Sequence, residues 1–495
     1  FLSRLSVGDR FVALPLQFNF KITFAKKFRK KVRGMENLEY IKKLIHKKIA
    51  ILGLGKNNFG LCGWLLKNGA QDITIFDQNE NIKDAVKKSN FARYSARLKY
   101  QTGKDYLGGI EDFDILFRTP GIPYLSPVVQ KARHAGVQIS SQTKLFFDLC
   151  PAKIIGITGT KGKGTTATLL FQMLSQKYSN QVANVYLAGN IGVDPFDFVS
   201  ELKEDDLVIY ELSSFMLQDL TQSPPVAVIL DITEDHLDHH KDRNEYIKSK
   251  QNIVLHQSQG DTAIINTDSL ASFAFAGITP ANVHWFSTRE EVQDGAYFEN
   301  GNFYFSFSHQ DLIISGSDIL LKGDHNRENI LASALTARLL GVSKKHIEQT
   351  LRKFKPLENR LQPVCEKNGI VAINDSYSTT PPSVKGALSA YPGSILLMGG
   401  KSKRTDFSAI ARIIPRQVKY LILFGETAKE IKALLPKGYK KFAIAKNLEM
   451  AIHEAVAIAK KGDTILLSPG CASFDEFKNA TERGKEFARW VNRLL

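Results

Sequence analysis

The sequence predicts an α/β protein with parallel sheets covered by helices, and three observations support this class. From Lys47 onward, short β-rich runs alternate with helical patterns. Several of those runs are followed at once by Gly, Asp, Glu, Asn or Ser, as in open sheets that bind ligands at the carboxyl ends of their strands. The length of 495 residues exceeds the roughly 250 to 300 residues over which one hydrophobic core grows, so we expect several domains.

The strand-like runs, in chain order, are residues 48–54, 72–76, 114–117, 154–157, 207–210, 226–230, 370–373, 395–398, 420–424 and 464–467. Two breaks in this order look like domain joins. The first, around residues 140–151, precedes a fresh strand and a glycine loop, and the second, around residues 354–359, follows a long helical stretch. We therefore divide the chain into an extension at 1–34 and three domains at 35–144, 145–356 and 357–495.

Composition excludes several classes of protein. With 43% apolar, 10% aromatic and 23% charged residues, the chain is neither disordered nor fibrous. No run approaches the roughly 18 uncharged apolar residues of a membrane-spanning helix. The four cysteines lie far apart, without CxxC or zinc-site spacing, which indicates a soluble protein of a reducing compartment such as the cytoplasm.

The net charge of +16 is concentrated at the start of the chain. Residues 1–34 hold nine basic side chains and one acidic side chain, which is half of the whole excess. The first methionine is Met35, so the extension is either artefactual or a real segment; a real one would be a basic amphipathic stretch for an anionic membrane or RNA. It is not a signal peptide, because its charges follow its apolar residues. The mild surplus of basic over acidic side chains in the rest of the chain suits a protein with anionic ligands.

A first glycine loop, Gly53-Leu-Gly-Lys-Asn-Asn58, follows the first strand. It is close to the dinucleotide-binding fingerprint, with Asn58 in place of the third glycine and Asp77 closing the next strand. We expect a nucleotide-like phosphate on the following helix N-terminus and a hydrogen bond from a sugar or base to Asp77. The side chain of Asn58 should weaken the close packing of that helix.

A second glycine loop, Gly156-Ile-Thr-Gly-Thr-Lys-Gly-Lys-Gly-Thr-Thr166, lies between an apolar strand and a helix that we expect to begin near Thr165. Its backbone N–H groups and Lys163 would cradle the β and γ phosphates of ATP, as in P-loops. Gly164 replaces the usual hydroxyl residue, so a magnesium-binding hydroxyl must come from Thr165 or be replaced by water. Glu211 lies at the end of the strand-like run at 207–210, His236 comes just after the run at 226–230, and both are candidates for binding phosphate-associated Mg²⁺.

A series of short motifs runs along the chain. They are Gly159-Thr-Lys-Gly-Lys163, Gly189-Asn-Ile-Gly192, Glu211-Leu-Ser-Ser-Phe215, Asp235-His-Leu-Asp238, Tyr246 to Lys250, Gly323-Asp-His-Asn-Arg-Glu-Asn329, Asn374-Asp-Ser376, Gly399-Gly-Lys-Ser-Lys403 and Ser468-Pro-Gly-Cys-Ala-Ser-Phe-Asp475. Together these motifs resemble those of the muramyl ligases, in the order found in that family and over about residues 45–495. The last motif, with the residues after it, is most similar to the D-glutamate-adding branch.

The resemblance implies three α/β domains: a Rossmann-like first domain that binds UDP, a central P-loop ATPase-like domain with a parallel sheet, and a Rossmann-like last domain that binds the amino acid. It implies a cytoplasmic, monomeric, ATP-dependent amide ligase with no nucleic-acid or membrane partner. ATP would phosphorylate the carboxylate of UDP-N-acetylmuramoyl-L-alanine, and D-glutamate would attack the acyl phosphate. Phosphorylation gives the carboxylate a leaving group, while positioning and charge neutralisation supply the catalysis.

The resemblance also implies residue roles. Catalytic positions are Lys163, Glu211, His236 and Lys250. The ATP positions are Gly159, Thr160, Lys161, Gly162, Lys163, Gly164, Thr165, Thr166, Asn326, Asn329, Arg360 and Asp375. Two Mg²⁺ ions would be held by Thr165, Glu211, His236 and Lys250, with Lys250 carbamylated by carbon dioxide. The UDP-sugar positions are Asn57, Asp77, Gln78, Gly121, Asn190 and Ser213, and the D-glutamate positions are Thr379, Lys403, Ser473 and Phe474.

Some positions depart from the family pattern. Besides Asn58 and Gly164, they are Met216 for a glutamine, Asp231 for an asparagine, Arg118 for the serine of a Ser-Pro-Gly turn, and Tyr377 for a lysine.

Two other functions stay open. A folylpolyglutamate-synthase-type ligase or another muramyl ligase shares the central domain, and a non-catalytic nucleotide-binding or nucleic-acid-associated protein could keep the fold. The strands lack the aromatic pattern of RNA-recognition modules.

Overall fold

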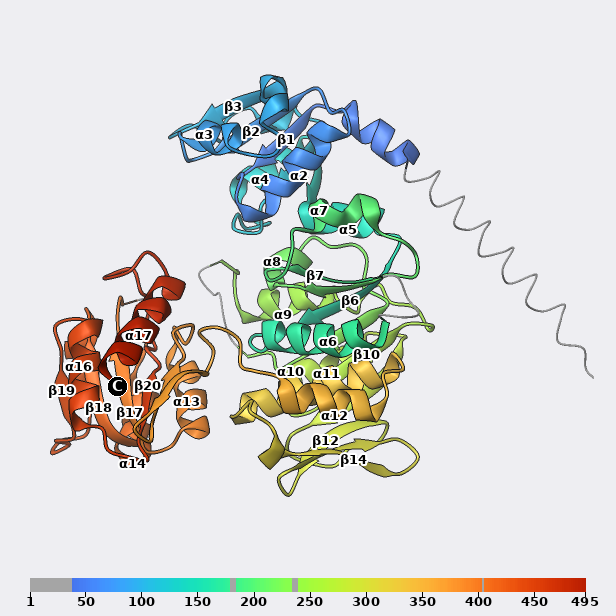
Figure 1. The fold of residues 1–495 in the computed structure, drawn as a ribbon. Coiled ribbons are helices and arrows are strands. Elements are labelled where there is room, and N and C mark those ends of the chain that lie inside the picture. Colours follow the sequence, from blue (N-terminus) through green and yellow to red (C-terminus); the bar gives the residue numbers. More distant parts are fainter. Residues whose placement is uncertain (1–37, 179–183, 234–238, 403–404) are drawn as a thin grey trace, which may run out of the picture. The chain divides into compact units, whose positions relative to one another are not determined.

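The computed structural model describes residues 38–178, 184–233, 239–402 and 405–495 (Figure 1). These residues hold three sheets. They divide into two compact units, of which the first runs up to Lys153 and adds Val193–Leu207 and Phe215–Gln222. The second unit contains the other two sheets. Predominantly parallel sheets with helices between the strands confirm the predicted three-part α/β architecture.

The first unit is built on a five-stranded parallel sheet in the order β3-β2-β1-β4-β5. Its strands are β1 (Ile49–Leu52), β2 (Ile73–Asp77), β3 (Leu98–Thr102), β4 (Ile115–Arg118) and β5 (Gln138–Ser141). Its α-helices are α2 (Lys56–Lys67), α3 (Ile82–Lys87), α4 (Pro127–His134), α5 (Gln142–Leu149) and α7 (Pro195–Phe198). All four residues of β1 are buried, as expected for a strand covered on both faces, and this strand order is the Rossmann one.

The central sheet has nine strands in the order β14-β13-β12-β11-β10-β9-β6-β8-β7. They are β6 (Lys153–Thr158), β7 (Val185–Gly189), β8 (Leu207–Glu211), β9 (Val226–Ile229), β10 (Thr262–Asn266), β11 (Asn282–Ser287), β12 (Gly295–Glu299), β13 (Asn302–Ser306) and β14 (Gln310–Ser315). The helices are α6 (Lys163–Tyr178), α9 (Arg243–Gln251), α10 (Leu270–Phe273), α11 (Asp324–Leu339) and α12 (Lys344–Lys353). The short helix α8 (Ser214–Leu217) begins in the second unit at Ser214 and continues in the first from Phe215.

One edge of the central sheet is antiparallel, which the sequence did not indicate. Strands β12, β13 and β14 pair antiparallel, whereas β6, β9, β10, β11 and β12 pair parallel along the sheet. Asn300 and Gly301 both have positive φ, so the β12–β13 connection adopts the left-handed turn that a tight hairpin needs.

The last sheet has the order β15-β16-β20-β17-β18-β19, with β15 antiparallel to its neighbour. Its strands are β15 (Gln362–Lys367), β16 (Ile370–Asn374), β17 (Ser394–Gly399), β18 (Val418–Phe424), β19 (Phe442–Ile444) and β20 (Thr464–Leu467). Its helices are α13 (Pro381–Ala390), α14 (Ser408–Gln417), α15 (Ala428–Leu434), α16 (Leu448–Ile458) and α17 (Ala480–Leu494). Along β17, Leu396 and Met398 join one hydrophobic cluster and Ile395 and Leu397 join another, so the period-two alternation fills a core on each face.

Every strand-like run that the sequence indicated is a strand in the structure. Helix α6 begins at Lys163, two residues before the expected start. Within the described ranges, we find no helix with the length and apolar character needed to span a bilayer.

Candidate active site

The second glycine loop joins β6 to α6, as the sequence predicts. Gly162 has a φ of +83°, a left-handed backbone that favours glycine. A Cβ atom there would lie 2.1 Å from Oδ1 of Asn329 on α11. The loop therefore needs glycine at this position both for its backbone conformation and for the approach of α11.

Three predicted ATP residues are linked by hydrogen bonds beside this loop. Thr166 Oγ1 donates to Asn329 Oδ1 at 3.1 Å, and Asn329 Nδ2 donates to Asn326 Oδ1 at 2.9 Å. Asn326 Nδ2 in turn donates to the carbonyl oxygen of Lys322 at 2.7 Å. The start of α11 is thereby fixed against the start of α6, although the two segments are about 160 residues apart in the sequence.

Lys163, on the first turn of α6, folds back over its own loop. Its Nζ donates to the carbonyl oxygens of Gly159 and Thr160, each at 3.0 Å. The amine therefore lies against the loop whose backbone N–H groups we expect to cradle phosphate. Thr165, the candidate hydroxyl ligand, is buried on the same helix.

Lys250 approaches the same loop from α9. Its side chain is buried, and its Nζ donates to Gly159 O at 3.0 Å and to Thr158 Oγ1 at 3.3 Å. The amine also lies 4.8 Å from the ring centroid of Tyr246, one helical turn earlier. Tyr246 and Lys250 therefore share the buried face of α9 that packs against the P-loop.

Glu211 closes β8 with a buried carboxylate. The end of β8 lies beside the end of β6, because Thr158 Oγ1 donates to the carbonyl oxygen of Leu212 at 2.9 Å. A carboxylate at the carboxyl edge of the sheet, next to a phosphate loop, is a suitable oxygen donor for Mg²⁺. His236 lies outside the described residues, and within those residues no group of three or more His, Cys, Asp and Glu side chains forms a metal cluster.

Sequence reasoning missed a hydrogen-bonded relay next to these residues. His240 is buried; its Nε2 lies 2.9 Å from Ser214 Oγ and its Nδ1 lies 2.5 Å from a carboxylate oxygen of Glu245. Ser214 begins α8, three residues after Glu211, and Glu245 is on the first turn of α9, which carries Lys250. His240 therefore connects the two candidate metal-binding segments. The Asp-His-Leu-Asp motif, which ends two residues before His240, was the available signal.

A cavity of about 550 Å³ lies in the first unit and one of about 120 Å³ in the second. The smaller cavity is lined by seven predicted ATP residues, which are Lys161, Gly162, Thr165, Asn326, Asn329, Arg360 and Asp375. Lys161 Nζ donates to Ser383 Oγ at 2.6 Å and to Thr380 Oγ1 at 3.2 Å.

Asp375 is buried in the wall of the smaller cavity. It accepts hydrogen bonds from the Leu361 N–H at 3.2 Å, from Ser468 Oγ at 2.9 Å and from Ser378 Oγ. Burial raises the pKa of Asp375 to about 6, although these hydrogen bonds oppose the rise.

The predicted UDP-sugar residues fall in both compact units. In the first unit, the Asp77 carboxylate accepts from the N–H groups of Leu54 at 2.7 Å and Asn79 at 2.8 Å, so it braces the first glycine loop. Asn57 Nδ2 donates to Gln142 Oε1 at 3.4 Å. Gln78 and Gly121 are exposed, and Asn190 and Ser213 belong to the second unit.

The expectation for Asn58 was wrong. The side chain is fully buried, and its Nδ2 donates to the carbonyl oxygens of Gly53 at 2.9 Å and Phe117 at 3.4 Å. Instead of loosening the helix, the amide ties α2 to the glycine loop and to β4.

The two predicted D-glutamate motifs lie side by side. The Lys401 N–H donates to Ala472 O at 2.9 Å, which joins the loop after β17 to the loop after β20. Ser473 is buried, and its Oγ has no hydrogen-bond partner among the described atoms. Such a hydroxyl is unusual unless a ligand or water satisfies it. Phe474 is 64% exposed, Thr379 is partly exposed, and Lys403 lies outside the described residues.

Comparison with known proteins decides the family. The Mur ligase middle domain matches residues 157–337, and the Mur ligase glutamate ligase domain matches residues 359–471. The UDP-N-acetylmuramoylalanine–D-glutamate ligases of Acetivibrio thermocellus and Clostridium acetobutylicum are each 36% identical over 467 residues, covering 92% of this chain and 98% of those proteins. The chain belongs to the Mur ligase family. It is therefore an ATP-dependent enzyme that forms C–N bonds.

Solved structures support the fold of this Mur ligase. MurF ligase from Thermotoga maritima, in complex with ADP, has a TM-score of 0.56 at 17% identity, covering 90% of this chain and 95% of that one. A pseudomurein peptide ligase type C from Methanothermus fervidus has a TM-score of 0.53 at 18% identity, with 90% and 100% covered.

The structure clarifies the departures in this Mur ligase. Thr119, not Arg118, precedes Pro120 and Gly121, so the turn keeps a hydroxyl residue and Arg118 stands one position earlier. Tyr377 is 40% exposed, donates to or accepts from Thr481 Oγ1 at 2.9 Å, and lies 5.3 Å below the Arg360 guanidinium. Gly164 is not crowded, because a Cβ there would be 3.6 Å from its nearest neighbour. Met216 is buried.

Proposed function

We propose that this Mur ligase joins the amino group of D-glutamate to the carboxylate of UDP-N-acetylmuramoyl-L-alanine, in peptidoglycan precursor synthesis. The observation that carries the proposal is the match to D-glutamate ligases along nearly their whole length, at 36% identity. The paired loops around Lys401 and Ser473 support it, because the buried Ser473 hydroxyl has no hydrogen-bond partner among the described residues and lies in the domain expected to bind the amino acid.

The residues of the second unit suit ATP and Mg²⁺. Lys163 and the N–H groups from Gly159 to Thr166 would hold phosphate, and Asn326, Asn329, Arg360 and Asp375 would line the rest of the nucleotide site. Glu211 would hold magnesium, with Thr165 and His236 as further ligands. When bound, ATP and Mg²⁺ supply the γ-phosphate and the charge neutralisation that make the substrate carboxylate reactive.

Lys250 fits this arrangement best as a carbamate. As an ammonium, its positive charge would repel Mg²⁺. Carbon dioxide adds to the neutral amine, with loss of a proton, to give an anionic oxygen ligand. Burial of Lys250 against the P-loop supports this role, because an oxygen on Nζ would lie next to the phosphates.

The substrate residues of this proposal are those named from the sequence. Asn57, Asp77, Gln78, Gly121, Asn190 and Ser213 would hold the UDP-sugar, and Thr379, Lys403, Ser473 and Phe474 would hold D-glutamate. A lysine and a hydroxyl suit the two carboxylates of glutamate. We further propose a monomer that acts in the cytoplasm without nucleic acid or membrane; no disulfide joins its four cysteines, all of which lie in described residues.

The test is phosphate release by the purified enzyme with ATP, Mg²⁺ and UDP-N-acetylmuramoyl-L-alanine. We expect release with D-glutamate and little with L-glutamate or without an amino acid. Lys163→Ala, prepared in parallel, should abolish release and so exclude a contaminating ATPase. Release only with a folate substrate and L-glutamate would move the function to a folylpolyglutamate-synthase-type ligase.

A further inference from the structure

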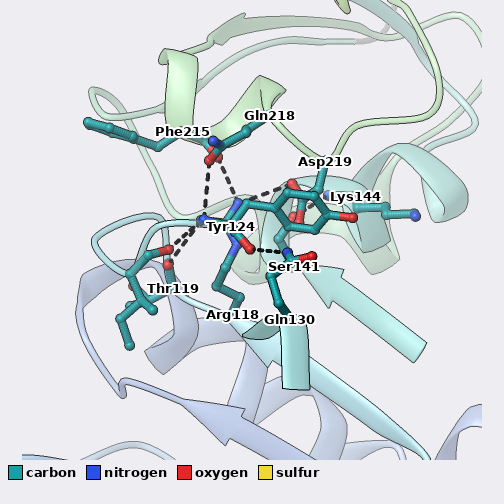
Figure 2. A network of polar contacts seen from close by, with 10 residues as sticks. Arg118, Thr119, Tyr124, Gln130, Ser141, Lys144, Phe215, Gln218 and Asp219 are labelled. Carbon is teal, nitrogen blue, oxygen red and sulfur yellow. Dashed lines mark hydrogen bonds and ion pairs between the residues drawn. The ribbon is translucent and has the colours of Figure 1, made fainter. Parts of the chain in front are cut away.

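Arg118, the last residue of β4, is fully buried in the first compact unit. Figure 2 shows its guanidinium at the centre of a polar network. Nη1 donates to the carbonyl oxygen of Ile122 at 2.7 Å, and Nη2 donates to the carbonyl oxygen of Phe215 at 2.9 Å. Nη2 also lies 3.2 Å from Oδ1 of Asp219, whose side chain is 3% exposed.

These contacts join two segments that are about 95 residues apart in the sequence. One is the turn from Thr119 to Ile122, which contains Gly121. The other begins at Phe215, two residues after Ser213. Gly121 and Ser213 are both proposed to hold the UDP-sugar, so a single side chain fixes a turn and a segment that lead to that substrate.

Two further hydrogen bonds hold Tyr124, which follows the Gly121 turn. The Tyr124 N–H donates to Gln218 Oε1 at 3.3 Å, and Gln130 Nε2 donates to the carbonyl oxygen of Tyr124 at 2.7 Å. Tyr124 also places its ring 5.8 Å from the Arg118 guanidinium. The residues after the Gly121 turn are therefore held to the same segment, as Figure 2 shows.

Charge and geometry have separable roles in this network. Asp219 needs a positive charge nearby, because a buried carboxylate without compensation is strongly destabilising. The two carbonyl oxygens need something different, a planar group with N–H donors that point in two directions. Arginine supplies both, whereas lysine supplies the charge from a single point and lacks the fork.

We propose that Arg118 is a positioning residue for the nucleotide-sugar substrate. Its fork sets the Gly121 turn and the segment after Ser213 in the arrangement that binds the UDP-sugar, while its charge serves stability through Asp219. This inference rests on the proposed function, since it assigns the UDP-sugar to these segments.

The experiment compares Arg118→Lys with Asp219→Asn. Arg118→Lys keeps a cation for Asp219 but loses the fork; we expect the melting temperature to stay near that of the wild type. Its Kd for UDP-N-acetylmuramoyl-L-alanine, measured by calorimetry, should rise about tenfold or more, because misplaced binding groups cost up to about a hundredfold. Its Kd for ATP should stay within about twofold. Asp219→Asn should do the reverse, with a lower melting temperature and nearly unchanged sugar-nucleotide affinity.

Each outcome decides between the alternatives. Wild-type affinity in Arg118→Lys would overturn the inference, and so would a parallel loss of ATP affinity and melting temperature, which would indicate a purely structural role. Failure of the proposed function can be distinguished from failure of the Arg118 inference, because calorimetry measures binding without turnover. An enzyme that binds the sugar nucleotide but releases no phosphate with D-glutamate would refute the function and still test Arg118. If the wild type does not bind the sugar nucleotide, both fail.

Discussion

The amine of Lys250 and the carbonyl oxygen of Gly159 form a buried hydrogen bond of 3.0 Å. It connects α9 to the first residue of the Gly159-Thr-Lys-Gly-Lys163 motif. The contact also places the Lys250 amine, which we propose carbon dioxide modifies, beside the proposed phosphate site. Much of the proposed chemistry depends on this contact.

Replacing Lys250 should therefore remove activity without unfolding the enzyme. We expect Lys250→Ala to lower kcat by about a hundredfold or more, because a metal ligand is lost. Added formate or acetate should restore part of the rate by supplying an anionic oxygen. The exposed Lys248, on the same helix, gives the matched control: Lys248→Ala should retain the wild-type rate. With ¹³C-bicarbonate, a carbamate NMR signal should appear in the wild type and be missing in Lys250→Ala; its absence from both would remove the carbamate.

Two glycines of the P-loop should respond differently to alanine. Gly162→Ala forces a Cβ into a left-handed backbone and against Asn329, so we expect a loss of about 2 to 4 kcal/mol in the free energy of unfolding. Gly164 lies in α6, where a Cβ would make only an ordinary contact of 3.6 Å with Ile191, and Gly164→Ala should change that free energy by less than about 1 kcal/mol. Urea denaturation measures both. Equal stability of the two variants would contradict the described contact with α11.

The hydrogen bonds of His240 to Ser214 and Glu245 should raise the affinity of the proposed metal site for its ion. His240→Ala removes the link between Ser214 and Glu245, and outer-shell contacts of this kind affect metal affinity by about 10- to 100-fold. We expect weaker Mn²⁺ binding in the presence of ATP, measured by electron paramagnetic resonance without turnover. The exposed His256 is the control, and His256→Ala should bind Mn²⁺ as the wild type does. Indistinguishable Mn²⁺ affinity in the two variants would argue against the relay.

Glu328 on α11 should make stability depend on pH. Burial, followed by the nearby carboxylates of Asp231 and Asp268, raises the pKa of Glu328 from 4.5 to about 8. Between these values the native state holds a proton that the unfolded chain has lost, so the free energy of unfolding falls as pH rises.

Glu328→Gln should abolish this fall. The free energy of unfolding of Glu328→Gln should exceed that of the wild type by roughly 1 to 3 kcal/mol at pH 8, after allowance for partial exposure. Near pH 4 the two free energies should be equal. Asp231→Asn should show part of the same gain. Parallel curves of unfolding free energy against pH for wild type and Glu328→Gln would contradict the raised pKa.

The sequence identified most of the buried strands and both glycine loops, because their signals are local, but it did not identify the buried inner strand β10. A run such as Ile49–Leu52 is apolar throughout, and a glycine loop follows it directly. Strand β3 was missed because only Leu98 of its five residues is buried, and β15 was missed because it is polar and contains Pro363. Edge strands of this kind form through their neighbours rather than through their own composition.

The candidate site likewise contains residues that local motifs predict and residues that only long-range contacts reveal. Lys163 and Glu211 stand in motifs that can be read locally. The partners of His240 are Ser214, 26 residues earlier, and Glu245, so the relay exists only after α8 and α9 have packed. Arg118 was misread as a substitution in a turn, although it is a buried residue whose partners, Phe215 and Asp219, come from a distant segment.

The central claim is that ATP activates the alanine carboxylate for attack by D-glutamate. Its most direct test uses UDP-N-acetylmuramoyl-L-alanine labelled with ¹⁸O in both carboxylate oxygens, incubated with ATP, Mg²⁺ and D-glutamate. Mass spectrometry of the released phosphate should show one ¹⁸O atom per phosphate, together with one new amide bond per ATP consumed. Unlabelled phosphate would contradict the account, because it would show that no oxygen passes from the carboxylate to phosphorus.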